Sequence, residues 1–185
     1  MTDQEIIEGC RKGKRKAQEA LYSKYAHKLM GICRRYSKNY QEAEDVFQEG
    51  FVRVFKSVGK LEKTGALEAW LKRVFINTAI NYYQKHKKHH DHVDYDLVYN
   101  SNDDYEHIIS NLNNQELLKF VNNLPDGYRM VFNLYAIEGY THKEIAATLG
   151  VTEGTSKSQL SKAKAMLKKR LGEFMEQEAL RLKTG

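Results

Sequence analysis

Residues 141–164 have the sequence THKEIAATLGVTEGTSKSQLSKAK, and they decide the fold of the C-terminal part of the chain. Thr141 and Glu144 form a capping box, which predicts a helix that begins directly after Thr141. Gly150 predicts a tight turn, and Thr152 is placed to cap a second helix. Two helices joined by a short turn that contains glycine form a helix-turn-helix, whose second helix lies in the major groove of DNA.

The second of these predicted helices has two different faces. Its inward residues recur at steps of four, three and four positions, and they are Ser156, Leu160, Ala163 and Leu167. Its outward residues are lysines and small hydroxyl residues, namely Lys157, Ser158, Ser161, Lys162, Lys164 and Lys168. Lysine meets phosphates or guanine edges, and short hydroxyl side chains let a helix approach DNA closely. The alternative explanation is a solvated, lysine-rich face on a bundle helix.

A further helix is predicted before the helix-turn-helix. Pro125 suits its first turn, and Gly139 is expected to end it. Its apolar side is predicted to consist of Met130, Val131, Leu134 and Ile137.

Residues 39–58, NYQEAEDVFQEGFVRVFKSV, predict a strongly amphipathic helix in the N-terminal part of the chain. Its apolar residues are Ala43, Phe47, Phe51, Val54 and Phe55. Asp45, Gln48 and Glu49 lie together on another side, and we call them the acidic ridge. A compact acidic surface in a basic protein suits docking of a basic helical partner, and a solvated face is the alternative.

Residues 66–90, ALEAWLKRVFINTAINYYQKHKKHH, predict the next helix. It combines aromatic rings, an amide side chain and a basic end, which a site for single-stranded nucleic acid needs. Trp70 and Phe75 are best explained as core residues, because aromatic residues at helical spacing usually pack inside. The better candidates for contacts to a ligand are Asn77, Tyr82 and Tyr83.

The composition excludes a membrane protein. Of the 185 residues 41% are hydrophobic, and no apolar run approaches the roughly 20 residues that a bilayer crossing needs. Residues 1–16 have no apolar core of the secretory type. We therefore expect a cytoplasmic protein without membrane insertion.

The net charge of +6 is unevenly distributed along the chain. No Lys or Arg occurs from His89 to Leu118, where the acidic residues are Asp91, Asp94, Asp96, Asp103, Asp104, Glu106 and Glu116. The rest of the chain carries +13, from 30 basic residues against 17 acidic ones. Two basic blocks that flank an acidic segment indicate a polyanionic partner.

No pattern for a metal, a cofactor or an enzymatic reaction is present in the sequence. The clustered histidines are His89, His90, His92 and His107, and they complete no ligand set. Cys10 and Cys33 form no CxxC pair, so we expect ordinary buried thiols in a reducing compartment. No Ser-His-Asp set and no Gly-rich phosphate loop occurs, so we expect no metal, no cofactor and no catalysis.

The resulting prediction is an all-α chain with two small helical domains, residues 1–90 and 112–173. An acidic, flexible linker of residues 91–111 joins them, and residues 174–185 form a C-terminal tail. The segments EAEDVFQEGFVRVF, AWLKRVFINTAINYYQKHKK and LPDGYRMVFNLYAIEGYTHKEIAATLGVTEGTSKSQLSKAKAMLKKRL resemble the two conserved regions of extracytoplasmic-function (ECF) sigma factors. These are small transcription-initiation subunits of bacterial RNA polymerase, and the resemblance covers about residues 8–172.

The resemblance implies that residues 1–90 form sigma region 2, which binds the polymerase and melts the −10 element. It implies that residues 112–173 form sigma region 4, whose helix-turn-helix binds the −35 element as duplex DNA. Core RNA polymerase would be a partner through the clamp helices of its β′ subunit and through its β flap. Promoter DNA and an anti-sigma factor would be further partners, and the acidic linker would pass through the RNA path of the polymerase.

The resemblance also assigns residues to these contacts. The polymerase clamp helices would meet Asp45, Gln48 and Glu49. The −10 single strand would contact Leu61, Glu62, Lys63, Arg73, Asn77 and Lys85, with an extruded base held by Asn77 and the loop of residues 61–67. The −35 element would contact Thr155, Lys157, Ser158, Gln159, Ser161 and Lys162.

The sequence departs from the family pattern at several positions of the last helix. Ser156 stands where an apolar residue is usual, so we expect this helix to seat less firmly. Gln159 stands where Arg is common, and Lys157 and Lys162 stand where Arg is frequent; Lys lacks the two-pronged geometry of Arg. The competing hypothesis is a helix-turn-helix regulator that acts without binding core polymerase, in which case the acidic ridge and the Asn77 face are incidental.

Overall fold

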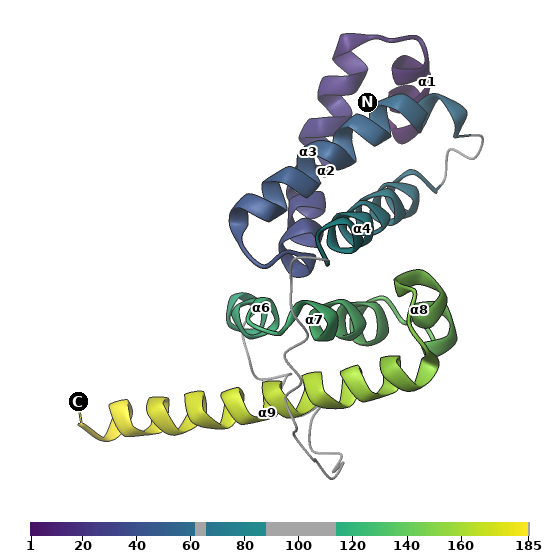
Figure 1. The fold of residues 1–185 in the computed structure, drawn as a ribbon. Helices are drawn as coiled ribbons and strands as arrows, with labels where there is room; N and C mark the ends of the chain where they lie inside the picture. Colours follow the sequence, from purple (N-terminus) through teal and green to yellow (C-terminus); the bar gives the residue numbers. More distant parts are fainter. Residues whose placement is uncertain (62–65, 88–113, 185) are drawn as a thin grey trace. The chain divides into compact units, whose positions relative to one another are not determined.

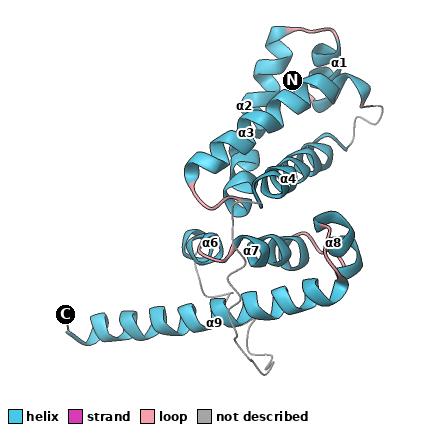
Figure 2. Cartoon of the chain, viewed as in Figure 1, coloured by secondary structure: helices cyan, strands magenta, loops and turns pink. Residues whose placement is uncertain are grey.

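The structure, a computed structural model, describes residues 1–61, 66–87 and 114–184, and all regular elements in these residues are helices (Figures 1 and 2). The chain divides into two compact units, Met1–Lys87 and Lys88–Gly185. The predicted all-α class with two helical units is therefore confirmed. The predicted linker of residues 91–111 lies outside the described residues, as do Glu62 and Lys63.

The N-terminal unit is a bundle of helices connected by short segments. Its elements are α1 (Asp3–Arg11), α2 (Arg15–Tyr36), α3 (Tyr40–Ser57), the 3₁₀ turn η1 (Val58–Lys60) and α4 (Leu67–His86). Helices α3 and α4 correspond to the two helices predicted over residues 39–58 and 66–90. Both pack against α2, the longest helix of this unit.

Aromatic side chains form the centre of the N-terminal core. The ring of Phe51 lies 4.9 Å from that of Phe47 and 5.3 Å from that of Phe75, centroid to centroid. Gly50 lets α3 come close to α4, because a Cβ atom at this position would lie 2.5 Å from Phe75 Cε1. Phe75 is fully buried, so its prediction as a core residue is confirmed.

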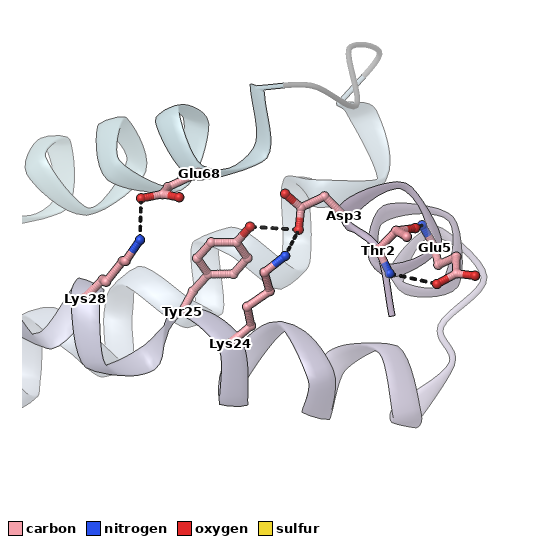
Figure 3. A network of polar contacts seen from close by, with 7 residues as sticks. All are labelled: Thr2, Asp3, Glu5, Lys24, Tyr25, Lys28 and Glu68. Atoms are coloured by element: carbon pink, nitrogen blue, oxygen red, sulfur yellow. Dashed lines mark hydrogen bonds and ion pairs between the residues drawn. The ribbon is translucent and has the colours of Figure 1, made fainter.

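Polar contacts join the helices of the N-terminal unit at its surface (Figure 3). Asp3 on α1 accepts hydrogen bonds from Lys24 Nζ at 2.7 Å and from Tyr25 Oη at 2.8 Å. The hydrogen bond from Lys24 is the main cause that lowers the pKa of Asp3. Lys28 on α2 pairs with Glu68 on α4 at 3.0 Å. These pairs are largely exposed, so they orient the helices and contribute little free energy of folding.

The C-terminal unit has a long helix along which the shorter ones pack (Figure 1). Its elements are α6 (Asn114–Asn122), α7 (Asp126–Phe132), the π turn η4 (Asn133–Ile137), α8 (His142–Leu149) and α9 (Glu153–Thr184). Helix α9 continues to Thr184 through residues that were expected to form a tail. Phe174 in this extension packs on Phe120 of α6, with ring centroids 5.7 Å apart.

The π turn corrects one prediction about the helix before the helix-turn-helix. Met130, Val131 and Leu134 are buried as expected, but Ile137 is 40% exposed. Glu138 N donates to Asn133 O, which is the i→i+5 bond of a π turn. This wider turn rotates Ile137 off the face that ordinary α-helical spacing assigns to it.

A buried arginine holds the connection between α6 and α7. Arg129 is 2% exposed, and its guanidinium donates to the carbonyl oxygen of Leu124 at 2.9 Å and to Asp126 Oδ1 at 2.5 Å. Burial of a charge is favourable only when it is paired and hydrogen-bonded, as it is here. No sequence pattern indicates the burial of this residue, because an arginine on an amphipathic helix is ordinarily exposed.

Candidate nucleic-acid interface

The helix-turn-helix forms as the sequence predicts. Thr141 Oγ1 accepts from the backbone N–H of Glu144, and the Glu144 carboxylate accepts from the backbone N–H of Thr141 at 2.8 Å. Gly150 has a φ of 67° and a left-handed conformation, which glycine adopts without strain. Thr152 Oγ1 then accepts from the backbone N–H of Thr155 at 3.0 Å and caps α9.

The inner face of α9 is the predicted one. Ser156, Leu160, Ala163 and Leu167 are all buried, with exposures of 0%, 6%, 0% and 0%. This face packs on α7 and α8, and the opposite face of α9 is therefore exposed to solvent.

Three polar or aromatic side chains join α8, α9 and η4, and we call them the Tyr135–His142–Ser156 clasp. His142 Nδ1 and Ser156 Oγ share a hydrogen bond of 2.9 Å. The His142 ring stacks on the Tyr135 ring, with centroids 4.7 Å apart and an interplanar angle of 21°. Ser156 is thus buried with a hydrogen-bond partner that contributes to the contact between the two helices, and its looser seating relative to an apolar residue stays a prediction.

The residues predicted to contact the −35 element differ in exposure. Lys157, Ser158 and Ser161 are exposed, whereas Thr155 and Lys162 are half-buried. Gln159 is also half-buried, and a Cβ atom at Gly127 would lie 3.1 Å from its Nε2. Gln159 thus lies against the start of α7, so Lys157, Ser158 and Ser161 are the most accessible of the six.

Helix α4 presents Arg73, Asn77 and Lys85 to solvent. Arg73 and Asn77 are one helical turn apart on the same side of α4, since residues four positions apart are neighbours on a helix. Lys85 lies two turns further on, near the C-terminal end of the helix. Tyr82 and Tyr83 are half-buried, so neither ring is fully available to a ligand.

A cavity of about 530 Å³ lies between the start of α4 and the end of α3. Its lining residues are Ser57, Lys60, Leu61, Ala66, Ala69, Trp70 and Arg73. Trp70 is only half-buried and forms part of this wall, which differs from its prediction as a core residue. In the described residues, Trp70 lines this cavity opposite Ser57, the last residue of α3. The cavity brings together Leu61 and Arg73 from the predicted −10 set.

The acidic ridge is exposed along α3, with Asp45, Gln48 and Glu49 all facing solvent. Arg53 Nη2 donates to Glu49 Oε1 at 2.5 Å, and both side chains are about half exposed. An exposed pair at i, i+4 contributes about 0.3–0.5 kcal/mol, so a basic partner can replace it at little cost.

One hydrogen bond links the acidic ridge to α4. Tyr82 Oη donates to Asp45 Oδ2 at 3.4 Å, and the Tyr82 ring lies 4.2 Å from that of His86. Burial first, and the neighbouring Asp45 charge second, raise the pKa of Tyr82 above its ordinary value. Sequence spacing could not reveal this contact, because the two residues are 37 positions apart.

The described residues contain no group of three or more His, Cys, Asp or Glu side chains that could hold a metal ion. The His89–His92 cluster lies outside them. Cys10 and Cys33 are buried free thiols, as predicted, and burial raises the pKa of Cys33 to about 12. None of the helices in the described part of the chain combines the length and apolar character that a bilayer crossing requires.

Comparison with known proteins identifies both units. The family model for sigma-70 region 2 matches residues 21–89, and that for sigma-70 region 4 matches residues 114–167. The chain is 27% identical over 182 residues to the RNA polymerase sigma-H factor of Pseudomonas aeruginosa, with 91% of this chain and 93% of that protein covered. It is also 27% identical over 175 residues to the ECF RNA polymerase sigma-E factor of Escherichia coli K12, with coverage of 89% and 91%.

These matches define a sigma factor of the sigma-70 class, in which regions 2 and 4 follow each other on one chain. Within that class the chain belongs to the ECF sigma factors. A solved structure of the sigma factor RpoE in complex with the anti-sigma factor NepR, from Bartonella quintana, has a similar fold. Its TM-score is 0.50 at 23% identity, and the alignment covers 83% of this chain and 96% of the other.

Proposed function

We propose that this chain binds core RNA polymerase and directs it to promoters whose −35 and −10 elements it contacts with two separate surfaces. The observation that carries the proposal is the presence, on one chain, of an intact helix-turn-helix and of a helical unit that has both an acidic ridge and an open cavity. The sigma factor family acts in transcription initiation without catalysing a reaction itself. We infer that this chain likewise performs no chemistry and acts in the cytoplasm, where the polymerase is.

The −35 element is contacted by the exposed face of α9. Lys157, Ser158 and Ser161 lie in its first three turns, close to the capped N-terminus that a recognition helix presents to the groove. Lys157 supplies a charge for a phosphate or a guanine edge, and the two serines are short enough for close approach. Thr155, Gln159 and Lys162 belong to the same proposed surface with less exposed side chains.

The −10 element is held as a single strand at the start of α4. The cavity of about 530 Å³ is large enough for a flipped base, and Trp70 gives it an aromatic wall on which a base can stack. Arg73 at its edge and Asn77 one turn further on supply a cation and an amide for the strand. Leu61, Glu62, Lys63 and Lys85 complete the proposed −10 set.

The polymerase is bound by the acidic ridge. Asp45, Gln48 and Glu49 are exposed on one side of α3, which suits the basic clamp helices of the β′ subunit. A second contact joins the β flap to the C-terminal unit. An anti-sigma factor that covers these surfaces holds the chain inactive, a proposal suggested by the RpoE–NepR complex.

The experiment is co-purification of the chain with core polymerase, followed by run-off transcription from promoters selected with the reconstituted holoenzyme. Asp45→Arg is expected to lower core affinity at least tenfold, because it places a cation where a basic partner docks. Glu44→Arg is the matched control, since Glu44 is the exposed neighbour outside the acidic ridge. Far-ultraviolet circular dichroism of both variants should be unchanged.

The competing function, a regulator that acts alone, predicts a different result. Such a protein binds duplex DNA tightly without polymerase and never co-purifies with the core enzyme. That outcome would refute the proposed function, and equal core affinity for Asp45→Arg and Glu44→Arg would remove the ridge assignment.

A further inference from the structure

A run of basic residues surrounds the turn between α1 and α2. Residues 11–16 read RKGKRK, with five cations and no acid in six positions. All six are exposed. The sigma-70 region 2 match begins at residue 21, so these residues precede the matched range.

Two of these cations have a partner in the protein. Arg15 pairs with Glu19 at 2.8 Å on the surface of α2. Arg11 Nε donates to the carbonyl oxygen of Gly59 at 2.9 Å, and its Nη2 donates to that of Leu61 at 3.0 Å. Arg11 therefore ties the end of α1 to the segment that contains Lys60.

The remaining lysines and Lys60 form one surface, which we call the basic corner: Lys12, Lys14, Lys16 and Lys60. All four are exposed. Arg11 brings them together, because it precedes Lys12 directly and bonds to the carbonyls on either side of Lys60.

The basic corner includes the N-terminal end of α2. Lys14 is the N-cap residue of α2 and makes no side-chain capping bond, and the first turn of α2 contains no acidic residue. The N-terminal end of a helix dipole is positive, so it disfavours cations and stabilises an anion. The corner is thus arranged for an anionic partner from outside the unit.

The basic corner adjoins the cavity proposed for the extruded −10 base. Lys60 and Leu61 line that cavity, and Arg11 holds the same segment from behind. A strand whose base enters the cavity continues on both sides with a phosphate at every nucleotide. A strand that leaves the cavity on the side of Lys60 meets the basic corner.

We propose that the basic corner binds the phosphodiester backbone of the melted promoter strand next to the base in the cavity. This inference rests on the proposed function, which supplies the strand. Lysines contact phosphates as point charges, so these contacts add affinity without adding sequence specificity. It lengthens the single-stranded footprint beyond the recognised base.

The test is binding of the strand to holoenzyme assembled with the full-length chain. The probe is a fluorescent non-template strand of a promoter that the wild-type holoenzyme selects from a randomised library. One version ends at the recognised base, and two others extend six nucleotides to the 5′ or the 3′ side. The variant is Lys12→Gln/Lys14→Gln/Lys16→Gln, and affinity is measured by anisotropy from 50 to 200 mM salt.

The wild-type holoenzyme should bind one extended strand more tightly than the short one, and the triple variant should lose that gain. Each lost phosphate contact lowers the slope of log K against log salt by about 0.7 for a single strand, so the triple variant loses about 2. Between 50 and 200 mM salt the wild type should then lose roughly 20-fold more affinity than the variant.

Matched single substitutions control for net charge. Lys14 and Lys38 flank the two ends of α2, and both are exposed. The 22 residues of α2, which lies between them, correspond to a helix about 33 Å long. Lys14→Gln should lower the salt slope, and Lys38→Gln should leave it unchanged.

Three results overturn the inference. An unchanged slope and affinity in the triple variant, with normal wild-type binding, shows that the corner does not touch the strand. Weaker assembly with core polymerase but unchanged strand binding assigns the corner to a protein partner instead. A wild-type chain that neither assembles with core nor initiates transcription refutes the proposed function and removes the strand on which this inference depends.

Discussion

The Tyr135–His142–Ser156 clasp predicts an asymmetric response to substitution of its two hydrogen-bonded members. His142→Ala leaves the Ser156 hydroxyl without its partner at a site that is 0% exposed. Ser156→Ala removes the hydroxyl instead, and the half-buried His142 ring can turn to water. The first change should therefore destabilise the helix-turn-helix more than the second.

The magnitudes follow from the geometry. An orphaned buried hydroxyl costs about 1–3 kcal/mol, and the lost ring stack at 4.7 Å costs about 0.5–1.5 kcal/mol, so His142→Ala should cost about 1.5–4.5 kcal/mol. Ser156→Ala should cost about 0.5–1.5 kcal/mol, the net value of one hydrogen bond. The double variant should cost less than His142→Ala alone, because no orphaned hydroxyl remains.

The assay is hydrogen exchange of the full-length protein, with peptides from α8 and the first turns of α9 resolved by mass spectrometry. A cost of about 1.5–4.5 kcal/mol corresponds to exchange that is roughly 10- to 1,600-fold faster in His142→Ala. The control is Lys143→Ala, the exposed neighbour, which should stay within about 0.5 kcal/mol of the wild type. Additive costs in the double variant, or equal costs for the two single variants, would refute the reasoning.

Three further predictions concern the core, the recognition helix and the thiols. Gly50→Ala should lower the free energy of unfolding by about 1–2 kcal/mol in urea denaturation, because its Cβ would overlap Phe75 by more than the gain in helix propensity can offset. Lys157→Ala should weaken use of the −35 element by about 1–3 kcal/mol in run-off transcription if the ammonium group contacts a base edge. Contact with a phosphate alone should instead give a similar loss at all sequences and a salt slope lower by about 1. Cys33, whose pKa burial raises to about 12, should not react with a thiol reagent at pH 8 until urea unfolds the chain.

Each of these has its own control. Gly31→Ala lies in α2 with no atom within 4 Å of the added Cβ, so it should stabilise the protein by up to about 1 kcal/mol. An equal effect of both alanines would contradict the packing argument at Gly50. Unchanged promoter use in Lys157→Ala would take that residue out of the DNA surface. Rapid reaction of the Cys33 thiol in the folded protein would show that its site opens readily.

The helix-turn-helix could be predicted from the sequence almost completely. Its capping box at Thr141, the glycine turn and the inner face of α9 all depend on residues within four positions of one another. The same local reasoning was wrong for Ile137, because the π turn that exposes it depends on how the helix packs. It also could not indicate the hydrogen-bond partner of Ser156, which is 14 positions away.

For the proposed polymerase and −10 surfaces, the sequence predicted which residues take part but not how contacts between helices arrange them. Spacing indicated that Asp45, Gln48 and Glu49 share one side of a helix, and they are exposed together on α3. Spacing could not indicate that Trp70 lines a cavity, because that cavity lies between two helices. The Tyr82–Asp45 hydrogen bond could not be predicted from sequence spacing either, since it joins two helices.

By itself the sequence determined the helical class, the two-unit organisation, the helix-turn-helix and the segregation of charge. These features follow from periodicity, capping and composition, which act between near neighbours on the chain. Only the tertiary structure decided which polar residues are satisfied in the core, how closely α3 approaches α4 at Gly50, and that Arg11 places a basic turn beside the cavity. Those features depend on contacts between residues far apart in sequence, whose pairing no local pattern specifies.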